Sequence, residues 1–147
     1  YREAEPDEAL AQTESVGGRA RILLMDDEDY IRRSTTKLLA HLGYEATAAV
    51  DGNEAESLFR QARERGEPFQ VVILDLTVPG GAGGKQALEK LKSIDPGVKA
   101  LLSSGYVDDP IMTHYEQYGF SGVITKPYEV EELSEMLRTM LGEGNAA

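Results

Sequence analysis

Short apolar runs alternate with segments of helical periodicity along most of the chain. Five mostly apolar runs are predicted to be strands, at 21–26, 44–50, 69–74, 98–104 and 121–125. In the segments between and after them, apolar residues recur every three or four positions, which is the spacing of one helix face. Strands and helices in strict alternation are typical of βαβ units. The pattern therefore predicts an α/β fold, a (βα)5 doubly wound five-stranded parallel sheet.

Each predicted helix carries an apolar stripe that should face the sheet. Four stripes are clear: Ile31, Leu38, Leu39 and Leu42; Ala55, Leu58, Phe59 and Ala62; Ala87, Leu88, Leu91 and Ile94; and Val130, Leu133, Leu137 and Leu141. A short fourth helix is expected to begin near Asp108-Asp109-Pro110, with Ile111, Met112, Tyr115 and Tyr118 on its face. Asp51 and Glu54 have the spacing of a capping box, which predicts the start of a helix there.

Polar residues follow the predicted strands at the places where the strands end. The run 69–74 is nearly continuous in apolar residues, as in a strand covered on both faces, and Asp75 comes directly after it. Right-handed crossovers bring the carboxyl ends of parallel strands to one edge of the sheet. This edge should gather Asp26, Asp27, Asp75, Ser103, Ser104 and Lys126. Converging carboxylates stay ionised only beside a cation, and all-oxygen ligands suit Mg²⁺, so a magnesium site is predicted.

Composition excludes several classes of function. The net charge is -11 and the 15 lysines and arginines are scattered, which argues against direct nucleic-acid binding. The chain has no cysteine and only two histidines, His41 and His114, which excludes disulfides and thiolate or histidine metal sites. Both histidines are expected at the surface. No apolar run approaches the ~20 residues of a membrane helix, so we expect no membrane contact and a cytoplasmic location.

The motifs at the strand ends resemble those of the receiver domain of two-component response regulators. Asp26-Asp27, Asp75, Ser104 and Lys126-Pro127 occur in the family's order, and the likeness extends over residues 20–142. Three further segments, 78–81, 103–106 and 119–122, are most similar to the C-terminal receiver of a hybrid sensor histidine kinase. The resemblance implies a flavodoxin-like fold with strand order 2-1-3-4-5 and a histidine kinase or phosphotransfer domain as partner.

The resemblance also implies the ligands of the metal ion. Asp27 would bind Mg²⁺ directly, and Asp26 would hold it through water. Asp75 and the backbone carbonyl of Thr77 would complete the ligands that the protein supplies.

The resemblance further implies how a phosphoryl group is handled. Asp75 would be the phosphoacceptor, Lys126 would contact the phosphoryl group, and the Ser104 hydroxyl would turn toward it after transfer. Ser103 is the adjacent alternative, but its neighbour Ser104 has the better spacing to Lys126. Val123 stands where the family often has a tyrosine or phenylalanine that acts as a rotamer switch, so the signal should leave the site differently.

The sequence also predicts domain boundaries and leaves alternative functions open. Residues 1–19 are expected to be an acidic linker or tail, residues 20–142 the receiver, and residues 143–147 a C-terminal tail, with dimer formation left open. The domain alone would accept a phosphoryl group without multiple turnover, although a hybrid parent would be a histidine kinase. The alternatives are a stand-alone single-domain regulator and a haloacid-dehalogenase-type Mg²⁺-dependent phosphatase. That phosphatase class needs a second acid where this chain has Thr77.

Overall fold

The chain forms a single five-stranded parallel sheet with helices on both faces. The computed structural model describes residues 20–76, 83–105 and 110–142. The strands lie in the order β2-β1-β3-β4-β5 and comprise β1 (Arg21–Met25), β2 (Glu45–Ala49), β3 (Val71–Asp75), β4 (Ala100–Ser104) and β5 (Gly122–Thr125). All four neighbouring pairs are parallel. The predicted fold class and strand order are confirmed.

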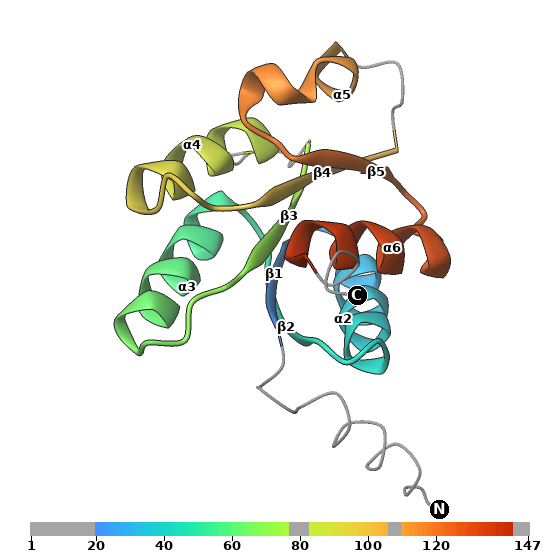
Figure 1. Cartoon of the computed structure of the whole chain (residues 1–147), viewed down its shortest axis with the longest axis horizontal. Coiled ribbons are helices and arrows are strands. Elements are labelled where there is room, and N and C mark those ends of the chain that lie inside the picture. The colour runs from blue at the N-terminus through green and yellow to red at the C-terminus, as the bar shows by residue number, and fades with distance from the viewer. Residues whose placement is uncertain (1–19, 77–82, 106–109, 143–147) are drawn as a thin grey trace, which may run out of the picture.

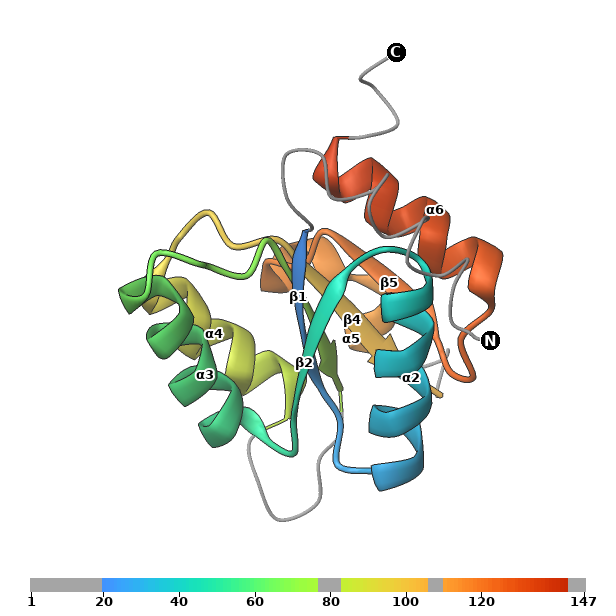
Figure 2. The same ribbon diagram turned by 90° about the horizontal axis from the view of Figure 1, so that it is seen from below.

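Two layers of helices enclose the sheet, as Figures 1 and 2 show. The helices are α2 (Asp29–His41), α3 (Gly52–Glu64), α4 (Gly84–Ile94), α5 (Pro110–Thr113), the 3-10 turn η1 (Tyr115–Tyr118) and α6 (Val130–Leu141). Helices α3 and α4 cover one face, and α2 and α6 cover the other. Each face has its own core cluster; the buried Met112 of α5 joins the cluster under α3 and α4, and the partly buried Tyr115 of η1 packs against it.

The burial of the strands follows from this two-sided cover. Every residue of β3 and of β4 is buried, because both lie inside the sheet with helices above and below. The edge strand β2 is buried only at its last residue, Ala49, and its alanines suit this lightly packed position. The Ala-rich run predicted as the second strand therefore forms an edge of the sheet.

The predicted capping box begins α3. The Asp51 carboxylate accepts a 2.9 Å hydrogen bond from the backbone N–H of Glu54. In return, the Glu54 carboxylate accepts a 2.7 Å bond from the backbone N–H of Val50, one residue earlier than in the standard motif. A cap of this kind stabilises a helix by about 1 kcal/mol, so the chain reverses reliably after β2.

Two details of the helices differ from the prediction. The fourth helix is broken into α5, a single turn, and η1, and its face is mixed: Met112 is buried whereas Tyr118 is 36% exposed. Val130 was predicted to lie on the buried stripe of the last helix, but its side chain is 49% exposed. It is the first residue of α6, and the helix meets the core only one turn later, at Leu133 and Leu137.

Among the residues that the structure describes, none of the helices combines the length and the apolarity needed to cross a bilayer. The predicted linker, 1–19, and the predicted tail, 143–147, lie outside the described residues.

Candidate functional site

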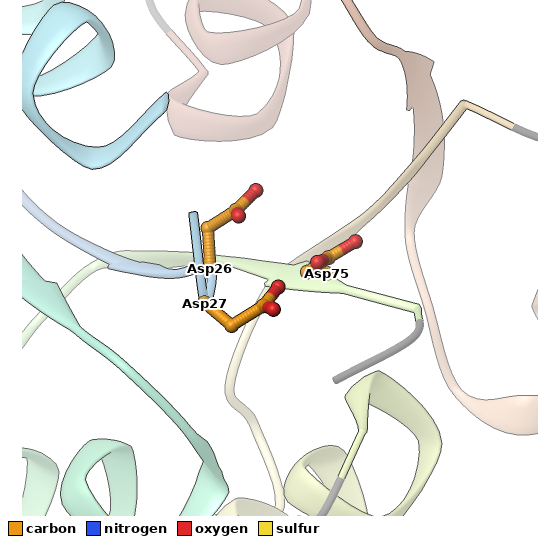
Figure 3. A group of neighbouring side chains, drawn as sticks. All are labelled: Asp26, Asp27 and Asp75. Carbon is orange, nitrogen blue, oxygen red and sulfur yellow. The ribbon is translucent and has the colours of Figure 1, made fainter. Parts of the chain in front are cut away.

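Three aspartates meet at the carboxyl edge of the sheet. Asp75 ends β3, and Asp26 and Asp27 directly follow β1, the strand that pairs with β3. Carboxylate oxygens of the three lie within 4.8 Å of one another, and Figure 3 shows the side chains together at these strand ends. Asp26 is fully buried and Asp75 is 4% exposed, whereas Asp27 faces solvent. The predicted convergence of the strand ends is therefore present, with two of the three acids buried.

Burial and crowding make Asp75 an unusual carboxyl group. Its pKa is raised from 3.8 to about 6, mainly by the loss of solvent and further by repulsion from Asp26 and, more weakly, Asp27. The neighbouring Lys126 acts in the opposite direction by attracting the ionised form. Asp75 is thus ionised at neutral pH, but in an environment that favours any added positive charge.

Lys126 supplies the positive charge nearest to the aspartates. Its Nζ atom is 3.1 Å from Asp26 Oδ2, 3.4 Å from Asp75 Oδ1 and 3.4 Å from Glu28 Oε1. Burial works against the charge of the ammonium group, but the hydrogen bond to Asp26 and the attraction of Asp75 outweigh it and raise the pKa of Lys126. The lysine therefore stays charged, and its side chain is only 15% exposed.

Asp26 is held by two groups that the sequence did not single out for this purpose. The backbone N–H of Glu28 donates to Asp26 Oδ1 at 2.9 Å, and the guanidinium of Arg32 donates to the Asp26 carbonyl at 2.9 Å. The turn from β1 into α2 is thereby fixed with the Asp26 carboxylate aimed at the edge of the sheet. Glu28, two positions after Asp26, could be seen in the sequence as a nearby acid, but its contact with Lys126 could not be predicted.

The pleat of the sheet assigns the site residues to faces. Parallel neighbours share a face, and residues two apart along a strand return to it. The residues two positions before Asp26, Asp75, Ser103 and Lys126 all lie in the core cluster under α2 and α6: Leu24, Ile73, Leu101 and Ile124. Ser104 follows Leu102, which belongs to the opposite cluster. Ser103 is therefore in the row of the aspartates, whereas Ser104 lies in the opposite row, at the end of β4.

Ser103 has a partner that sequence reasoning missed. Its Oγ atom is 2.6 Å from the hydroxyl of Tyr128, which packs against the cluster under α2 and α6. Burial raises the pKa of Tyr128 to about 12, and the Asp26 charge contributes, while the hydrogen bond to Ser103 opposes the increase. The only sequence signal was the position of this tyrosine two residues after Lys126.

A glycine lets α4 start directly against the site. A Cβ atom at Gly84 would lie 2.8 Å from the carbonyl oxygen of Asp75, closer than real contacts allow. The chain can therefore turn back onto the end of β3 only with glycine at this position.

Three other positions were predicted from the sequence: Thr77 as a metal ligand, and His41 and His114 as surface residues. Thr77, predicted to offer its carbonyl to a metal, lies outside the described residues. His41 and His114 are exposed, which confirms that they are surface residues.

Comparison with known proteins adds independent findings. Residues 22–138 match the response regulator receiver domain family. The sensor kinase CckA of Brucella abortus is 26% identical over 94% of this chain and 14% of the kinase. The response regulator GacA of Pseudomonas protegens is 34% identical over 80% of this chain and 54% of that protein. The chain thus spans about half or less of these curated relatives.

A solved structure of the chemotaxis protein CheY4 from Vibrio cholerae has the same fold. It superposes with a TM-score of 0.75 at 25% identity, over 84% of this chain and 99% of CheY4.

Proposed function

The chain belongs to the response regulator receiver domain family, and on that premise we propose that Asp75 accepts a phosphoryl group from a phosphohistidine. The donor would be a histidine kinase or a phosphotransfer domain of a two-component system. The observation that carries the proposal is the placement of Lys126 Nζ between Asp26 and Asp75, 3.1 and 3.4 Å away, at the edge where the carboxylates meet.

The chemistry needs positioning and charge neutralisation more than a base. A carboxylate oxygen of Asp75 attacks phosphorus while the nitrogen–phosphorus bond of the donor breaks. The electron pair of that bond returns to the imidazole, which leaves neutral when its other ring nitrogen carries a proton. Asp75 has no proton to lose above its pKa of about 6, so no general base is required. Lys126 offsets the charge that accumulates on the phosphoryl oxygens.

The same carboxylates fit a magnesium ion. Their oxygens lie within 4.8 Å of one another and are the hard donors that this ion prefers. We propose that Asp27 and Asp75 bind it directly, that Asp26 holds it through water, and that the carbonyl of Thr77 is a further ligand. When bound, the ion supplies charge neutralisation for the carboxylates and the incoming phosphoryl group.

Ser104 is the proposed second contact of the phosphoryl group. It ends β4 and is 2% exposed, and its carbonyl accepts a hydrogen bond from the backbone N–H of Lys126 at 3.0 Å. The hydroxyl would reach the site by rotating around the strand end once new oxygen acceptors are present. That movement would transmit phosphorylation to α5 and η1.

We also propose that this receiver is part of a hybrid sensor kinase. The match to CckA extends over 94% of the chain, more than the 80% covered by GacA, although its identity is lower. The alternative is a stand-alone regulator. The coding sequence upstream of Tyr1 distinguishes the two, because a histidine kinase core there would identify the hybrid.

Labelling with a small donor tests the central proposal. Phosphoramidate, which also carries a nitrogen–phosphorus bond, is supplied with Mg²⁺, and the mass of the intact protein is followed. We expect one phosphoryl group per chain, lost in hydroxylamine and absent in Asp75→Asn. Asp51→Asn is the matched control, since asparagine still caps α3 and labelling should be normal. Labelling that persists in Asp75→Asn would contradict the choice of acceptor, and release of phosphate over many turnovers would indicate the phosphatase class.

A further inference from the structure

A pair of hydroxyl groups lies beside the carboxylate cluster and has no role in the transfer described above. The Oη atom of Tyr128 and the Oγ atom of Ser103 are 2.6 Å apart. Ser103 is fully buried in β4, and Tyr128 packs with the core under α2 and α6. A buried hydroxyl that loses its partner costs free energy, so this hydrogen bond holds the phenol against β4.

Ser103 is also tied to the strand of the proposed phosphoacceptor. It pairs with Asp75 in the register of β3 and β4. Its carbonyl accepts a 2.8 Å hydrogen bond from the backbone N–H of Leu76, the residue after Asp75. The position of Ser103 therefore follows the end of β3.

Tyr128 is likewise tied to the lysine of the site. It lies two residues after Lys126, whose backbone N–H donates to the Ser104 carbonyl at 3.0 Å. The segment 126–128 is thus attached to β4 at two points, one through the backbone and one through side-chain hydroxyls. Lys126 Nζ lies 3.4 Å from Asp75 Oδ1. Asp75, Ser103, Tyr128 and Lys126 are therefore linked in a ring of contacts.

We propose that Tyr128 is a positioning residue for phosphoryl transfer: its hydrogen bond to Ser103 holds the segment after β5 so that Lys126 Nζ stands between Asp26 and Asp75. A lysine has a long flexible stem, so the place of its ammonium group depends on how firmly its backbone is held. The inference rests on the proposed role of Asp75 as acceptor. The positioning of Lys126 comes from the hydroxyl of Tyr128 and not from its ring, which phenylalanine would retain.

Removing only the hydroxyl is the first test. Tyr128→Phe in the full chain should slow labelling from phosphoramidate and Mg²⁺ about three- to tenfold, the equivalent of one hydrogen bond. Ser103→Ala should slow it similarly, and the double variant should be no slower than either single one. Tyr44→Phe is the control, because Tyr44 is a buried tyrosine of the same core cluster just before β2, at the other end of the sheet. Its labelling rate should match the wild type.

The second test asks whether Tyr128 acts through Lys126. In a Lys126→Ala background, Tyr128→Phe should cause no further loss of rate, although it would still lower stability. A general structural role would give the same loss of rate in both backgrounds. That result, or a Tyr128→Phe labelling rate equal to the wild type, would overturn the inference.

A third measurement does not depend on phosphorylation. Acetylation of lysines by acetic anhydride, quantified by mass spectrometry, should modify Lys126 several-fold faster in Tyr128→Phe than in the wild type. The exposed Lys37 serves as the internal reference. If the wild type is never labelled on Asp75, the proposed function fails, and the reactivity of Lys126 still decides the positioning role. Unchanged reactivity would refute it.

Discussion

Charged side chains gather at both ends of the sheet, but the acids are exposed at one end and mostly buried at the other. At the amino end, Arg21 at the start of β1 pairs with Glu45 and Glu67, whose side chains are 51% and 57% exposed. At the carboxyl end, Lys126 pairs with Asp26 and Asp75, whose side chains are 0% and 5% exposed. The first group is an ordinary solvated ion pair network, whereas the second keeps charge in the interior.

The balance of charge differs as well. Asp26, Asp27 and Asp75 lie together, and within the described part of the chain Lys126 is the cation paired with Asp26 and Asp75. Exposed pairs contribute little to stability, whereas buried excess charge destabilises a fold unless something compensates it. Buried excess charge is typical of sites where that charge binds a cation or takes part in a reaction. We therefore propose that the amino end of the sheet is structural and that the carboxyl end is functional.

Among variants that keep the acceptor Asp75, the largest effect on labelling should come from removing the only cation paired with the buried acids in the described residues. Lys126→Ala should slow labelling of Asp75 roughly 100-fold, because a positioned cation that stabilises developing charge has about this effect. Labelling rates measured at saturating Mg²⁺ would check this. Arg21→Met, which removes the corresponding cation at the amino end, should leave the rate unchanged. Equal losses in the two variants would mean that the ends do not differ in function.

Asp75→Asn should make the protein more stable while it abolishes labelling. The increase of the Asp75 pKa from 3.8 to about 6 corresponds to at most about 3 kcal/mol. Solvent at the edge screens part of it, so we expect about 1–2 kcal/mol.

The pH dependence of that gain has a definite sign. The folded-state pKa of Asp75 is higher than its unfolded value, so the wild type loses stability relative to Asp75→Asn as the pH rises from about 4 to about 6. Above this range the difference should be constant, and below it the two proteins should converge. Urea unfolding in chelator, followed by circular dichroism at several pH values, measures it. A wild type that is as stable as the variant at pH 7.5 would contradict the desolvation of Asp75.

Asp27→Asn should weaken Mg²⁺ binding without disturbing the fold. Asp27 is the exposed member of the cluster, and its loss removes one negative ligand, for which we expect about a tenfold lower affinity. Titration with Mg²⁺, followed by the rate of labelling at low donor concentration, would give the change. The exposed Asp29→Asn, two residues later on α2, is a control and should bind Mg²⁺ like the wild type.

The smallest effect belongs to the amino end. Arg21→Met should lower the free energy of unfolding by about 0.5–1 kcal/mol, because exposed pairs and hydrogen bonds of this kind contribute little. Chemical unfolding at neutral pH would measure it. A loss of several kcal/mol would show that this network, too, is essential to the fold.

Several features could be predicted because they depend on local pattern and on general rules of chain topology. Periodicity located all five strands and the four long helices, with ends that shifted by at most a few residues. The rule that parallel strands end at one edge brought Asp26, Asp27, Asp75 and Lys126 together without knowledge of any contact. Side-chain burial at element ends was less predictable, as the exposed Val130 and the broken fourth helix show.

The sequence by itself determined the sheet, the order of strands and helices along the chain, and the acids and lysine of the site. These features depend on the spacing of apolar residues and on the residues that directly follow each strand, and both are local in the sequence. Only the tertiary structure decided which of two adjacent serines lies in the row of the aspartates. That choice depends on the register of β4 against β3, which pairs Ser103 with Asp75. The contacts of Lys126 with Glu28 and of Ser103 with Tyr128 join residues 98 and 25 positions apart. Such contacts arise from packing geometry, which no local pattern specifies.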